Sequence, residues 1–460
     1  MTDPRVAAQG VRRVSGLNRR TGVVRPEPID LSPSVQGHTP RPYQEKGVVF
    51  LKTNARALLG DEMGLGKSCQ ILRALPRRAR VIIVCPASVI LVWEAEIASW
   101  RPDLKVTVGE ELRRPDEGEI LLISYDSLPD VPASTFSLVL EPMGDVYLVL
   151  DEAHMVKSDN AQRTTKVRML GHQCGHVWGA TGTPMLGTPP DLWGVLLSLG
   201  LAHVFGSLDH FIELCGGKPK WRYDKRQGRA VRCGYEWGKI SPAVRETLAT
   251  VMLRRRRADV LKDLPPEHVI DVPVRAPEDL TAFLDRVKDA WDDVGADDLP
   301  PFELLSEARA ALARSKIPAL LDLVGEASES FPLLVFSAHV DPILAVAEKF
   351  GKDACVLMGG ESAADRRRAV EGFKAGRKRI LAMTIKAGGA GLNLQEAGGM
   401  VFCDEEWTPG LNDQARARAS RPGQKHARIT IWRLVSSHPV DVRLAEILDE
   451  KRRLQGEAIG

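Results

Sequence analysis

The sequence predicts an α/β protein with two parallel-sheet units in tandem. Short apolar runs rich in Val, Ile and Leu alternate with stretches that suit helices, which is the pattern of strands buried on both faces of a parallel sheet. This alternation breaks at residues 200–240 and then begins again. Strand, helix, strand order that repeats within each half indicates two open sheets with crossover helices.

The elements can be assigned in chain order. The first half predicts strands at residues 81–84, 120–123 and 146–150, with a crossover helix at 91–100. The second half predicts an amphipathic helix at 278–294, followed by strands at 333–336, 355–357, 380–383, 400–402 and 429–432. Leu264-Pro265-Pro266 interrupts any helix between the halves, so we place one lobe at 38–260, with an insert at about 206–240, and the other at 261–460.

The composition limits the class of protein. Hydrophobic residues are 44% and charged residues 27% of 460 positions, as in globular proteins with a sizeable core. A net charge of +3 means that any affinity for nucleic acid must come from a local basic surface. Seven scattered cysteines without a Cys-x-x-Cys pair suggest reduced thiols. No signal peptide is visible, and the apolar stretch at 192–205 is too short to span a bilayer. We therefore expect a soluble cytoplasmic protein, associated with a bacterial or viral nucleoid and nuclear only in a eukaryote.

The N-terminal residues 1–37 form a predicted basic tail. They hold six arginines against three acidic residues, with Gly, Ser and Pro punctuation and no apolar period. Such a tail either contacts DNA phosphates or is simply a solvated terminus.

Residues 60–68, Gly-Asp-Glu-Met-Gly-Leu-Gly-Lys-Ser, are a candidate phosphate-binding loop that closes a short apolar run. Gly64 and Gly66 allow the main chain to turn its N–H groups inward. Lys67 would reach the outer phosphates, and Ser68 would open a helix and offer its oxygen to Mg²⁺. The alternative is a Gly-rich turn before a helix that binds no nucleotide.

A pair of carboxylates follows the predicted strand 146–150. Asp151 and Glu152 stand at its carboxyl end, the edge at which ligands bind in open parallel sheets. Asp151 would hold Mg²⁺ together with Ser68, and Glu152 would orient or deprotonate the attacking water. The alternative is a helix N-terminus with favourable acidic residues.

A row of polar and basic residues near the C-terminus is a candidate arginine finger. Gln414, Arg418 and Arg421 have i, i+4, i+7 spacing, so a helix that ends at Pro422-Gly423 would place them on one face. Guanidinium groups in such a row suit a γ-phosphate held by the other lobe. The alternative is a solvated basic helix, which Arg416 fits better than its neighbours.

With these motifs the chain resembles superfamily-two helicase motors of the SWI/SNF type, over nearly all of residues 41–448. The resemblance implies two RecA-like lobes with the ATP site in the cleft between them. It also implies ATP and Mg²⁺ as cofactors. Arg41-Pro42-Tyr43-Gln44 resembles the segment in which Gln44 reads adenine, and Asp61 belongs to the family's own variant of the phosphate loop. Thr181-Gly182-Thr183-Pro184 resembles the element that couples hydrolysis to DNA contacts, although Gly187 stands where the family usually has Asn.

Further motifs match the same family. Residues 85–88 with Trp93, 384–394, 404–409 and 414–424 resemble its remaining elements, with Ser420 and Pro422 departing from the usual His and Ile. The resemblance implies Lys67, Asp151, Glu152, Arg418 and Arg421 as catalytic residues. It implies a nucleotide site of Gln44, Asp61, Gly64, Gly66, Lys67, Ser68, Gly391 and Gln414. It implies DNA contacts through Ser88, Trp93, Lys157, Arg222, Thr384, Lys386 and Trp407.

The insert predicts a β-hairpin with one aromatic and one basic face. Residues 216–239 contain eight basic residues against two acidic ones, and their aromatic residues fall at odd positions on both sides of 226–229. Two paired residues of the hairpin lie on the same face, so the aromatic residues can pair with one another only if odd positions pair with odd positions. A loop with an odd number of residues gives this pairing. Two interpretations remain open: a flap that grips DNA, or a hairpin whose aromatic residues pack on the first lobe. This region most resembles the annealing-helicase branch of the family.

Two smaller clusters are ambiguous. Arg254 to Arg257 form a run of four arginines just before the lobe boundary, where contact with DNA and a bracing role are both open. His172, Cys174 and His176 have the spacing of a strand face. No fourth ligand is visible for zinc, so packing is the favoured interpretation.

The resemblance implies an ATP-dependent translocase on double-stranded or branched DNA that remodels or re-anneals it, in replication, repair or recombination. We expect a monomer that binds mainly phosphates. One alternative is a strand-separating DNA or RNA helicase on the same lobes. Another is a non-catalytic clamp that binds DNA and ATP without turnover, against which the complete set of catalytic residues argues.

Overall fold

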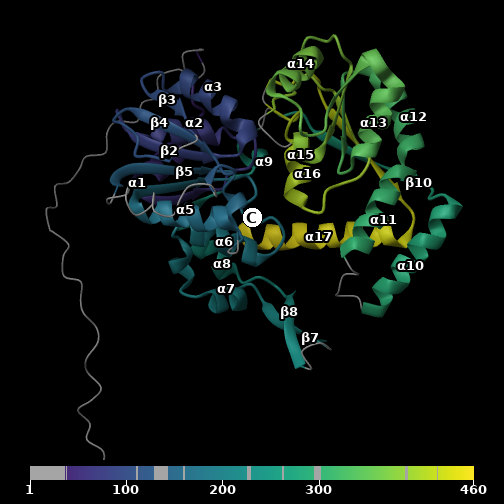
Figure 1. Cartoon of the computed structure of the whole chain (residues 1–460), viewed down its shortest axis with the longest axis horizontal. Helices are drawn as coiled ribbons and strands as arrows, with labels where there is room; N and C mark the ends of the chain where they lie inside the picture. Colours follow the sequence, from purple (N-terminus) through teal and green to yellow (C-terminus); the bar gives the residue numbers. More distant parts are fainter. Residues whose placement is uncertain are drawn as a thin grey trace, which may run out of the picture.

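The protein folds into two α/β lobes that face each other and are bridged by a long C-terminal helix (Figure 1). This computed structural model describes residues 37, 39–109, 112–128, 143–158, 161–224, 229–261, 264–294, 302–388, 392–421 and 423–460. The predicted basic tail, apart from Gly37, lies outside the described residues. Among the residues that the structure describes, no helix has the length and apolar character needed to cross a membrane.

Lobe 1 is built on a parallel sheet with the strand order β3-β4-β2-β5-β6-β1-β9. Its strands are β1 (Arg56–Leu59), β2 (Arg80–Cys85), β3 (Lys105–Val108), β4 (Glu119–Ser124), β5 (Met143–Asp151), β6 (Cys174–Ala180) and β9 (Met252–Leu253). Its helices are α1 (Pro42–Thr53), α2 (Lys67–Ala74), α3 (Ile90–Trp100), α5 (Gln162–Gln173), α6 (Pro189–Ser198), α7 (Leu208–Leu214) and α8 (Pro242–Leu248). The predicted strands β2, β4 and β5 and the crossover helix α3 are confirmed.

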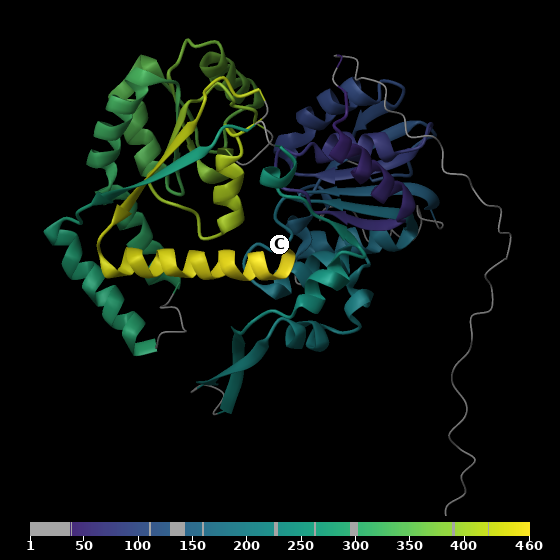
Figure 2. The ribbon, with the colours of Figure 1, turned by 180° about the vertical axis from the view of Figure 1, so that it is seen from behind.

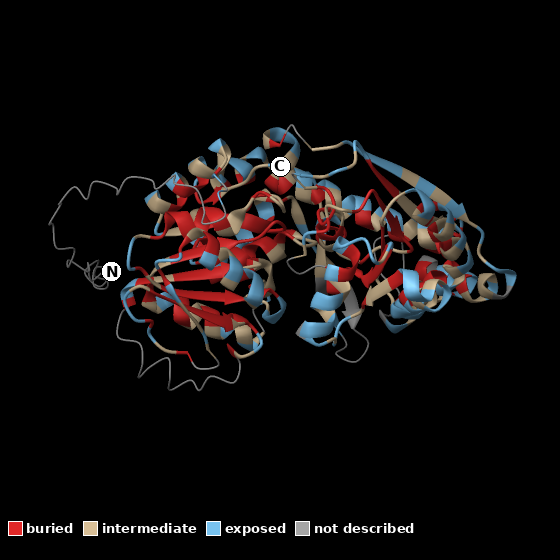
Figure 3. Ribbon diagram, turned by 90° about the horizontal axis from the view of Figure 1, so that it is seen from above, coloured by how far each residue is buried: buried red, intermediate tan, exposed pale blue. Residues whose placement is uncertain are grey.

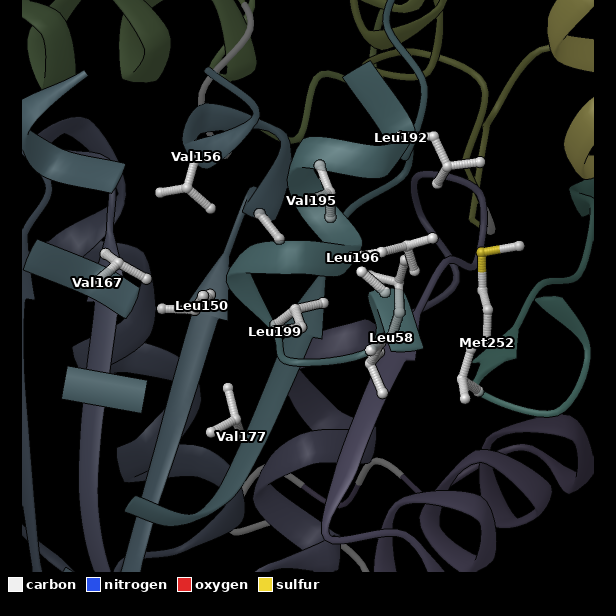
Figure 4. Packing of buried hydrophobic residues seen from close by; sticks show 14 of the residues in the cluster. Leu58, Leu150, Val156, Val167, Val177, Leu192, Val195, Leu196, Leu199 and Met252 are labelled. Carbon is white, nitrogen blue, oxygen red and sulfur yellow. The ribbon is translucent and has the colours of Figure 1, made fainter. Parts of the chain in front are cut away.

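Both faces of this sheet are covered by helices, which explains its continuous apolar runs. Along β1, Leu58 packs into one core with Leu150, Val177 and Leu199 under α5 and α6 (Figure 4). Its neighbour Leu59 points the other way, into a second core under α1, α2 and α3. A strand buried on both faces has no solvent side, so it shows no polar alternation.

Lobe 2 repeats the plan with a parallel sheet ordered β10-β15-β14-β11-β13-β12. The strands are β10 (Glu267–Val274), β11 (Leu333–Ser337), β12 (Ala354–Leu357), β13 (Ile380–Thr384), β14 (Gly399–Phe402) and β15 (Ile429–Ser436). The helices are α10 (Glu278–Val294), α11 (Phe302–Ser315), α12 (Ile317–Ser330), α13 (Val340–Phe350), α14 (Ala363–Lys374), α15 (Ile385–Gly388), α16 (Pro409–Arg416) and α17 (Pro439–Ile459). All five predicted strands and helix α10 are confirmed, and two α/β parallel-sheet lobes are therefore the fold that the sequence predicts.

The chain passes between the sheets after β9, through the short helix α9 (Arg257–Val260), and enters lobe 2 at β10. The buried residues gather in two bodies that the connecting segments join (Figure 3). Helix α17 then returns from lobe 2 and inserts Leu454, Ala458 and Ile459 into the lobe 1 core (Figure 2). The predicted lobe boundary at residue 260 assigns all of α17 to lobe 2, although its last turns pack in lobe 1. The end of α17 is far from lobe 1 in sequence, so the sequence does not indicate this contact.

The predicted hairpin is present as β7 (Gly217–Asp224) and β8 (Arg229–Trp237). An odd-numbered loop was predicted, and this is wrong: Asp224 pairs with Arg229, so residues 225–228, outside the described residues, connect the strands. A β-bulge between Lys220 and Trp221 shifts the register, and equal-parity pairing holds only nearer the lobe, as in Gly217 with Trp237.

Candidate active site

The phosphate-binding loop leaves the end of β1 and enters α2 at Lys67. Gly64 and Gly66 both have positive φ, 82° and 68°, which L side chains rarely adopt. A Cβ at Gly66 would also lie 2.3 Å from Gln44 Nε2. Gln44 Nε2 donates to Leu65 O at 3.2 Å, so the start of α1 is tied to the curve of the loop.

Lys67 is held inside this curve. Its Nζ donates to the carbonyl oxygens of Asp61 at 2.9 Å and Glu62 at 3.4 Å. Burial lowers the pKa of Lys67, while the charges of Glu152, Asp61 and Asp151 act in the opposite direction. The structure therefore brings the lysine of the loop and the two predicted carboxylates into one buried electrostatic cluster.

Asp151 ends β5 in a fully supported position. Its Oδ2 accepts a hydrogen bond from Trp93 Nε1 at 2.8 Å, and its backbone oxygen accepts one from the Tyr125 hydroxyl at 2.9 Å. Burial, and next the neighbouring Glu152, raise the pKa of Asp151 to about 6. The Trp93 side chain is 2% exposed and its indole donates to this carboxylate, so its predicted DNA contact has no support from this arrangement and stays a prediction.

One carboxylate oxygen of Glu152 accepts a hydrogen bond, and the other is buried without one among the described residues. Its backbone has a positive φ of 48°, a strained conformation that turns the side chain at the strand end. Oε1 accepts a hydrogen bond from Gln414 Nε2 of lobe 2 at 3.0 Å. Oε2 accepts none from the residues that the structure describes, although it lies 3.3 Å from His154 Nδ1. Burial raises the pKa of Glu152, which suits a group that takes a proton from water.

His154 is a neutral link between the carboxylates and residues Thr181 to Pro184, called the coupling segment below for the role that the resemblance implies. Burial, with the charge of Lys157, lowers its pKa to about 4. Its Nδ1 lies 2.9 Å from Thr181 Oγ1 and 3.4 Å from Thr183 Oγ1. The contact between His154 and Thr181 was not predicted, since no local pattern relates residues that far apart.

Lobe 2 contributes Gln414 and Arg418, but not from a single helical face. Helix α16 ends at Arg416, so Arg418 and Arg421 lie in the turns beyond it and the predicted i, i+4, i+7 row is wrong. Backbone contacts, including Leu394 N to Arg418 O at 3.0 Å, shape this segment instead.

The two predicted finger residues have different surroundings. Burial lowers the pKa of Arg418 to about 9, with Arg421 acting in the same direction and Glu152 opposing it. Burial lowers the pKa of Arg421 to about 10, followed by the charge of Arg257. Both remain cations at neutral pH. The charge of Glu152 acts on Arg418, whereas Arg421 Nε donates to Ala417 O at 3.0 Å within its own turn.

Arg416 is not the solvated residue that the sequence suggested. Its Nη2 donates to Glu405 at 2.9 Å, and Arg452 of α17 meets the same carboxylate at 3.2 Å. Arg433 of β15 lies 3.9 Å from it. Glu405 thus joins the end of α16 to the rest of lobe 2.

The coupling segment touches lobe 2 directly. A Cβ at Gly410, in the first turn of α16, would lie 2.4 Å from Thr183 Cγ2. Beside this contact a cavity of about 290 Å³ is lined by Glu62 and Arg254 from lobe 1 and by Asp413 from lobe 2. Only a residue without a side chain permits this approach between the lobes.

Asp61 lies in the phosphate loop, where its backbone oxygen accepts a hydrogen bond from Lys67, but its side chain has other partners. Its role in nucleotide binding stays a prediction. Its carboxylate is completely buried, where Arg255 Nε donates to Oδ1 at 2.9 Å and Arg255 Nη2 donates to Oδ2. Gln70 Nε2 donates to Oδ2 at 3.1 Å. Asp61 fixes the loop to the segment that follows β9.

The run of four arginines braces the lobes. Arg254 Nη1 donates to Gly60 O at 2.8 Å and to Gly182 O at 3.2 Å, which links the phosphate loop to the coupling segment. Arg257 Nη1 donates to Ser420 O of lobe 2 at 2.7 Å. Arg256 is exposed and pairs with Asp259. Of the two open interpretations, the structure supports bracing.

The predicted DNA contacts are in varied environments. Ser88 is exposed after β2, and Lys386 is 73% exposed with Nζ 3.2 Å from Glu406. Lys157 Nζ lies 2.8 Å from Asp191. The Thr384 side chain is buried and donates to Met358 O at 3.1 Å, and its contact with DNA stays a prediction. The Arg222 side chain and Gly391 lie outside the described residues.

Two cationic side chains lie over the Trp407 ring, a cluster that the sequence did not predict. Lys451 Nζ of α17 lies 4.3 Å from its ring centre, and Arg309 of α11 lies 5.7 Å from it. Burial, followed by the charge of Arg309, lowers the pKa of Lys451 to about 8. These elements meet only in the folded protein, so no sequence spacing indicates the cluster.

The His-Cys-His triplet lies at the start of β6 and the helix before it. Cys174 is buried, and His176 stacks on Tyr147 with ring centres 4.1 Å apart. Within the described ranges, no group of three His, Cys, Asp or Glu residues is placed to hold a metal. For Mg²⁺, which keeps several waters and needs few protein ligands, the half-buried Ser68 hydroxyl and Asp151 carboxylate are a fitting pair.

Two family models match most of the chain. An SNF2-related domain model matches residues 43–278, and a helicase conserved C-terminal domain model matches residues 315–423. The chain is 26% identical over 91% of its length to the human DNA annealing helicase and endonuclease ZRANB3, and covers 40% of that protein. It is 27% identical over 93% of its length to the putative ATP-dependent helicase/translocase YwqA of Bacillus subtilis, and covers 50% of that protein. The chain thus spans half or less of these relatives. The solved SWI2/SNF2 ATPase core of Sulfolobus solfataricus in complex with dsDNA has 21% identity and a TM-score of 0.41, over 90% of this chain and 92% of that one.

Proposed function

Because this chain belongs to the SNF2-related family of helicase-like ATPases, we propose that it hydrolyses Mg·ATP between its lobes and uses lobe closure to move along double-stranded DNA. One observation carries the proposal: Gln414 of lobe 2 donates to Glu152 of lobe 1 at 3.0 Å. The residue that would position the water is therefore in contact with the lobe that must move.

The roles of the residues follow from their surroundings. The loop amides and Lys67 would bind the phosphates, and Ser68 with Asp151 would hold Mg²⁺, which neutralises charge on the phosphates. Glu152 would orient and deprotonate the water through its open Oε2. Arg418 would supply positive charge at the γ-phosphate as the cleft closes.

Several contacts would convert closure into motion. Thr183 lies against Gly410 at the start of α16, and Arg257 donates to Ser420 just after its end. A change in the cleft would therefore reach both ends of this helix. Exposed groups such as Ser88 and Lys386 would meet DNA phosphates from the two lobes. Contacts to phosphates carry no sequence information, so binding would tolerate any sequence and fall steeply with salt.

The finer task would be to remodel or re-anneal branched DNA in replication, repair or recombination. The human relative ZRANB3 supports this, because it is a DNA annealing helicase and endonuclease and 91% of this chain is similar to 40% of it. Such a motor would move on the duplex without separating its strands.

The test is ATPase activity with duplex, single-stranded and forked DNA and with RNA. Wild type should turn over fastest with duplex or forked DNA. Lys67→Ala should abolish turnover because the phosphates have no lysine to bind, and Glu152→Gln should abolish it while ATP still binds. Stimulation by single strands or RNA that equals that by duplex would contradict the proposal. No turnover under any condition would favour a clamp.

A further inference from the structure

The β7–β8 hairpin is an arm that the proposed motor does not use. It extends from lobe 1 below α7 and α8, away from both sheets (Figures 1 and 2). It forms a separate two-stranded sheet. Its described strands therefore need an explanation beyond lobe packing.

The base of the arm is rigid. Trp237 packs against the lobe 1 core, and Tyr235 lies against it with ring centres 5.3 Å apart. Just after β8, Ile240 N donates to Glu457 Oε2 of α17 at 3.1 Å. The arm is thus anchored where the C-terminal helix of lobe 2 meets lobe 1, so movement of the lobes would carry it.

The alternation of side chains along β7 continues this aromatic face outward, past the β-bulge between Lys220 and Trp221. Gly217 pairs with Trp237 and Pro219 with Tyr235, so these four positions share one face of the hairpin. Trp221, two residues beyond Pro219, lies on the same face. Trp221 is 63% exposed, the largest exposed fraction of any large apolar side chain in the described residues. An aromatic row thus runs from the core to an exposed indole.

The excess positive charge of the arm indicates a negatively charged partner. Residues 216–239 hold eight lysines and arginines against Asp224 and Glu236, whereas the whole chain carries only +3. A basic strand pair beside an exposed indole combines phosphate contacts with a stacking surface, as in proteins that bind unpaired nucleic acid. An indole needs an open base face, which stacked duplex DNA does not offer except at a junction or end.

We propose that the β7–β8 arm binds DNA at unpaired bases, with Trp221 stacked on a base and the surrounding lysines and arginines on its phosphates. This inference rests on the proposed function for one point, that the partner is DNA. It goes beyond that function because the arm would select forks and single strands, while the cleft between the lobes moves on duplex.

Binding of single-stranded, forked and blunt duplex oligonucleotides tests the arm. Trp221→Ala should weaken binding to single-stranded and forked DNA between about 5-fold and about 150-fold, the range for removal of one stacked base. Blunt duplex binding and duplex-stimulated turnover should stay at wild-type levels. Trp221→Phe should retain most of the affinity because it still offers a ring. Leu344→Ala, an exposed apolar residue of α13 in lobe 2, is the matched control.

Charge is tested separately. Lys218→Ser with Arg229→Ser should reduce the salt dependence of single-strand binding by about 0.7 in log–log slope for each phosphate that is no longer neutralised. Lys349→Ser with Lys352→Ser, exposed positions of lobe 2, should leave the slope unchanged.

The outcomes separate the two proposals. If Trp221→Ala binds forks and single strands as Leu344→Ala does, while duplex still stimulates turnover, the arm inference is overturned and a protein partner becomes the better occupant. If DNA never stimulates wild-type turnover but single-strand binding depends on Trp221, the arm inference stands and the proposed motor function fails. Thermal melting of Trp221→Ala should match wild type, because this side chain is outside the core.

Discussion

Replacing Arg255 with Met should destabilise lobe 1 strongly, although the residue lies in a run of four arginines. Arg255 is the only cation that the structure, within its described residues, bonds to the fully buried Asp61 carboxylate. Its removal leaves a buried charge with the Gln70 amide as its remaining side-chain donor. Breaking one side of a buried ion pair in this way costs about 3–5 kcal/mol of unfolding free energy.

Arg256→Met is the matched control, because it removes the same group one position away. Arg256 and its partner Asp259 are both more than half exposed, and an exposed pair contributes about 0–1 kcal/mol. Urea unfolding followed by circular dichroism measures both variants. The double variant Arg255→Met with Asp61→Asn should recover most of the stability, since the unpaired charge is gone. Equal unfolding midpoints for the two single variants, or no recovery in the double variant, would refute the reasoning.

Two further predictions concern the site. Trp93→Phe removes a hydrogen bond that favours the charged form of Asp151, so the pKa of Asp151 should rise above about 6. The acid limb of the pH profile of kcat/KM should then move to higher pH. An acid limb at the wild-type pH would contradict this. Gly410→Ala should drive a Cβ into Thr183 and force the lobes apart, lowering kcat at least tenfold with unfolding unchanged. Gly456→Ala in α17, where a Cβ meets nothing within 4 Å, should keep full activity, and equal kcat for both glycine variants would refute the role of the contact.

Local sequence determines much of this fold. The strands buried on both faces read as unbroken apolar runs, as in β2, β4 and β5, because each has a core on either side. The strand missed at 267–274 is β10, an edge strand whose residues are exposed or half-buried and so lack that signal. The catalytic motifs are also local, since Lys67 follows one strand and Asp151 ends another.

Roles set by distant contacts were not predictable. Asp61 belongs to a phosphate-loop motif, yet its partner Arg255 is 194 residues away. The i, i+4, i+7 spacing of Gln414, Arg418 and Arg421 suggested one helix, but the fold ends α16 at Arg416. Trp93 matches a DNA-contact motif, and its indole supports Asp151. In each case tertiary packing sets surroundings that the local pattern does not show.

Displacement of a triplex-forming third strand from duplex DNA tests the central claim most directly. Wild type with ATP should displace the third strand, because a motor that moves along duplex must clear it. Arg418→Ala should bind ATP and DNA but turn over at least about 10³-fold more slowly and displace nothing, since lobe 2 no longer supplies charge at the γ-phosphate. Displacement by Arg418→Ala at the wild-type rate, or none by wild type while it hydrolyses ATP, would contradict the account.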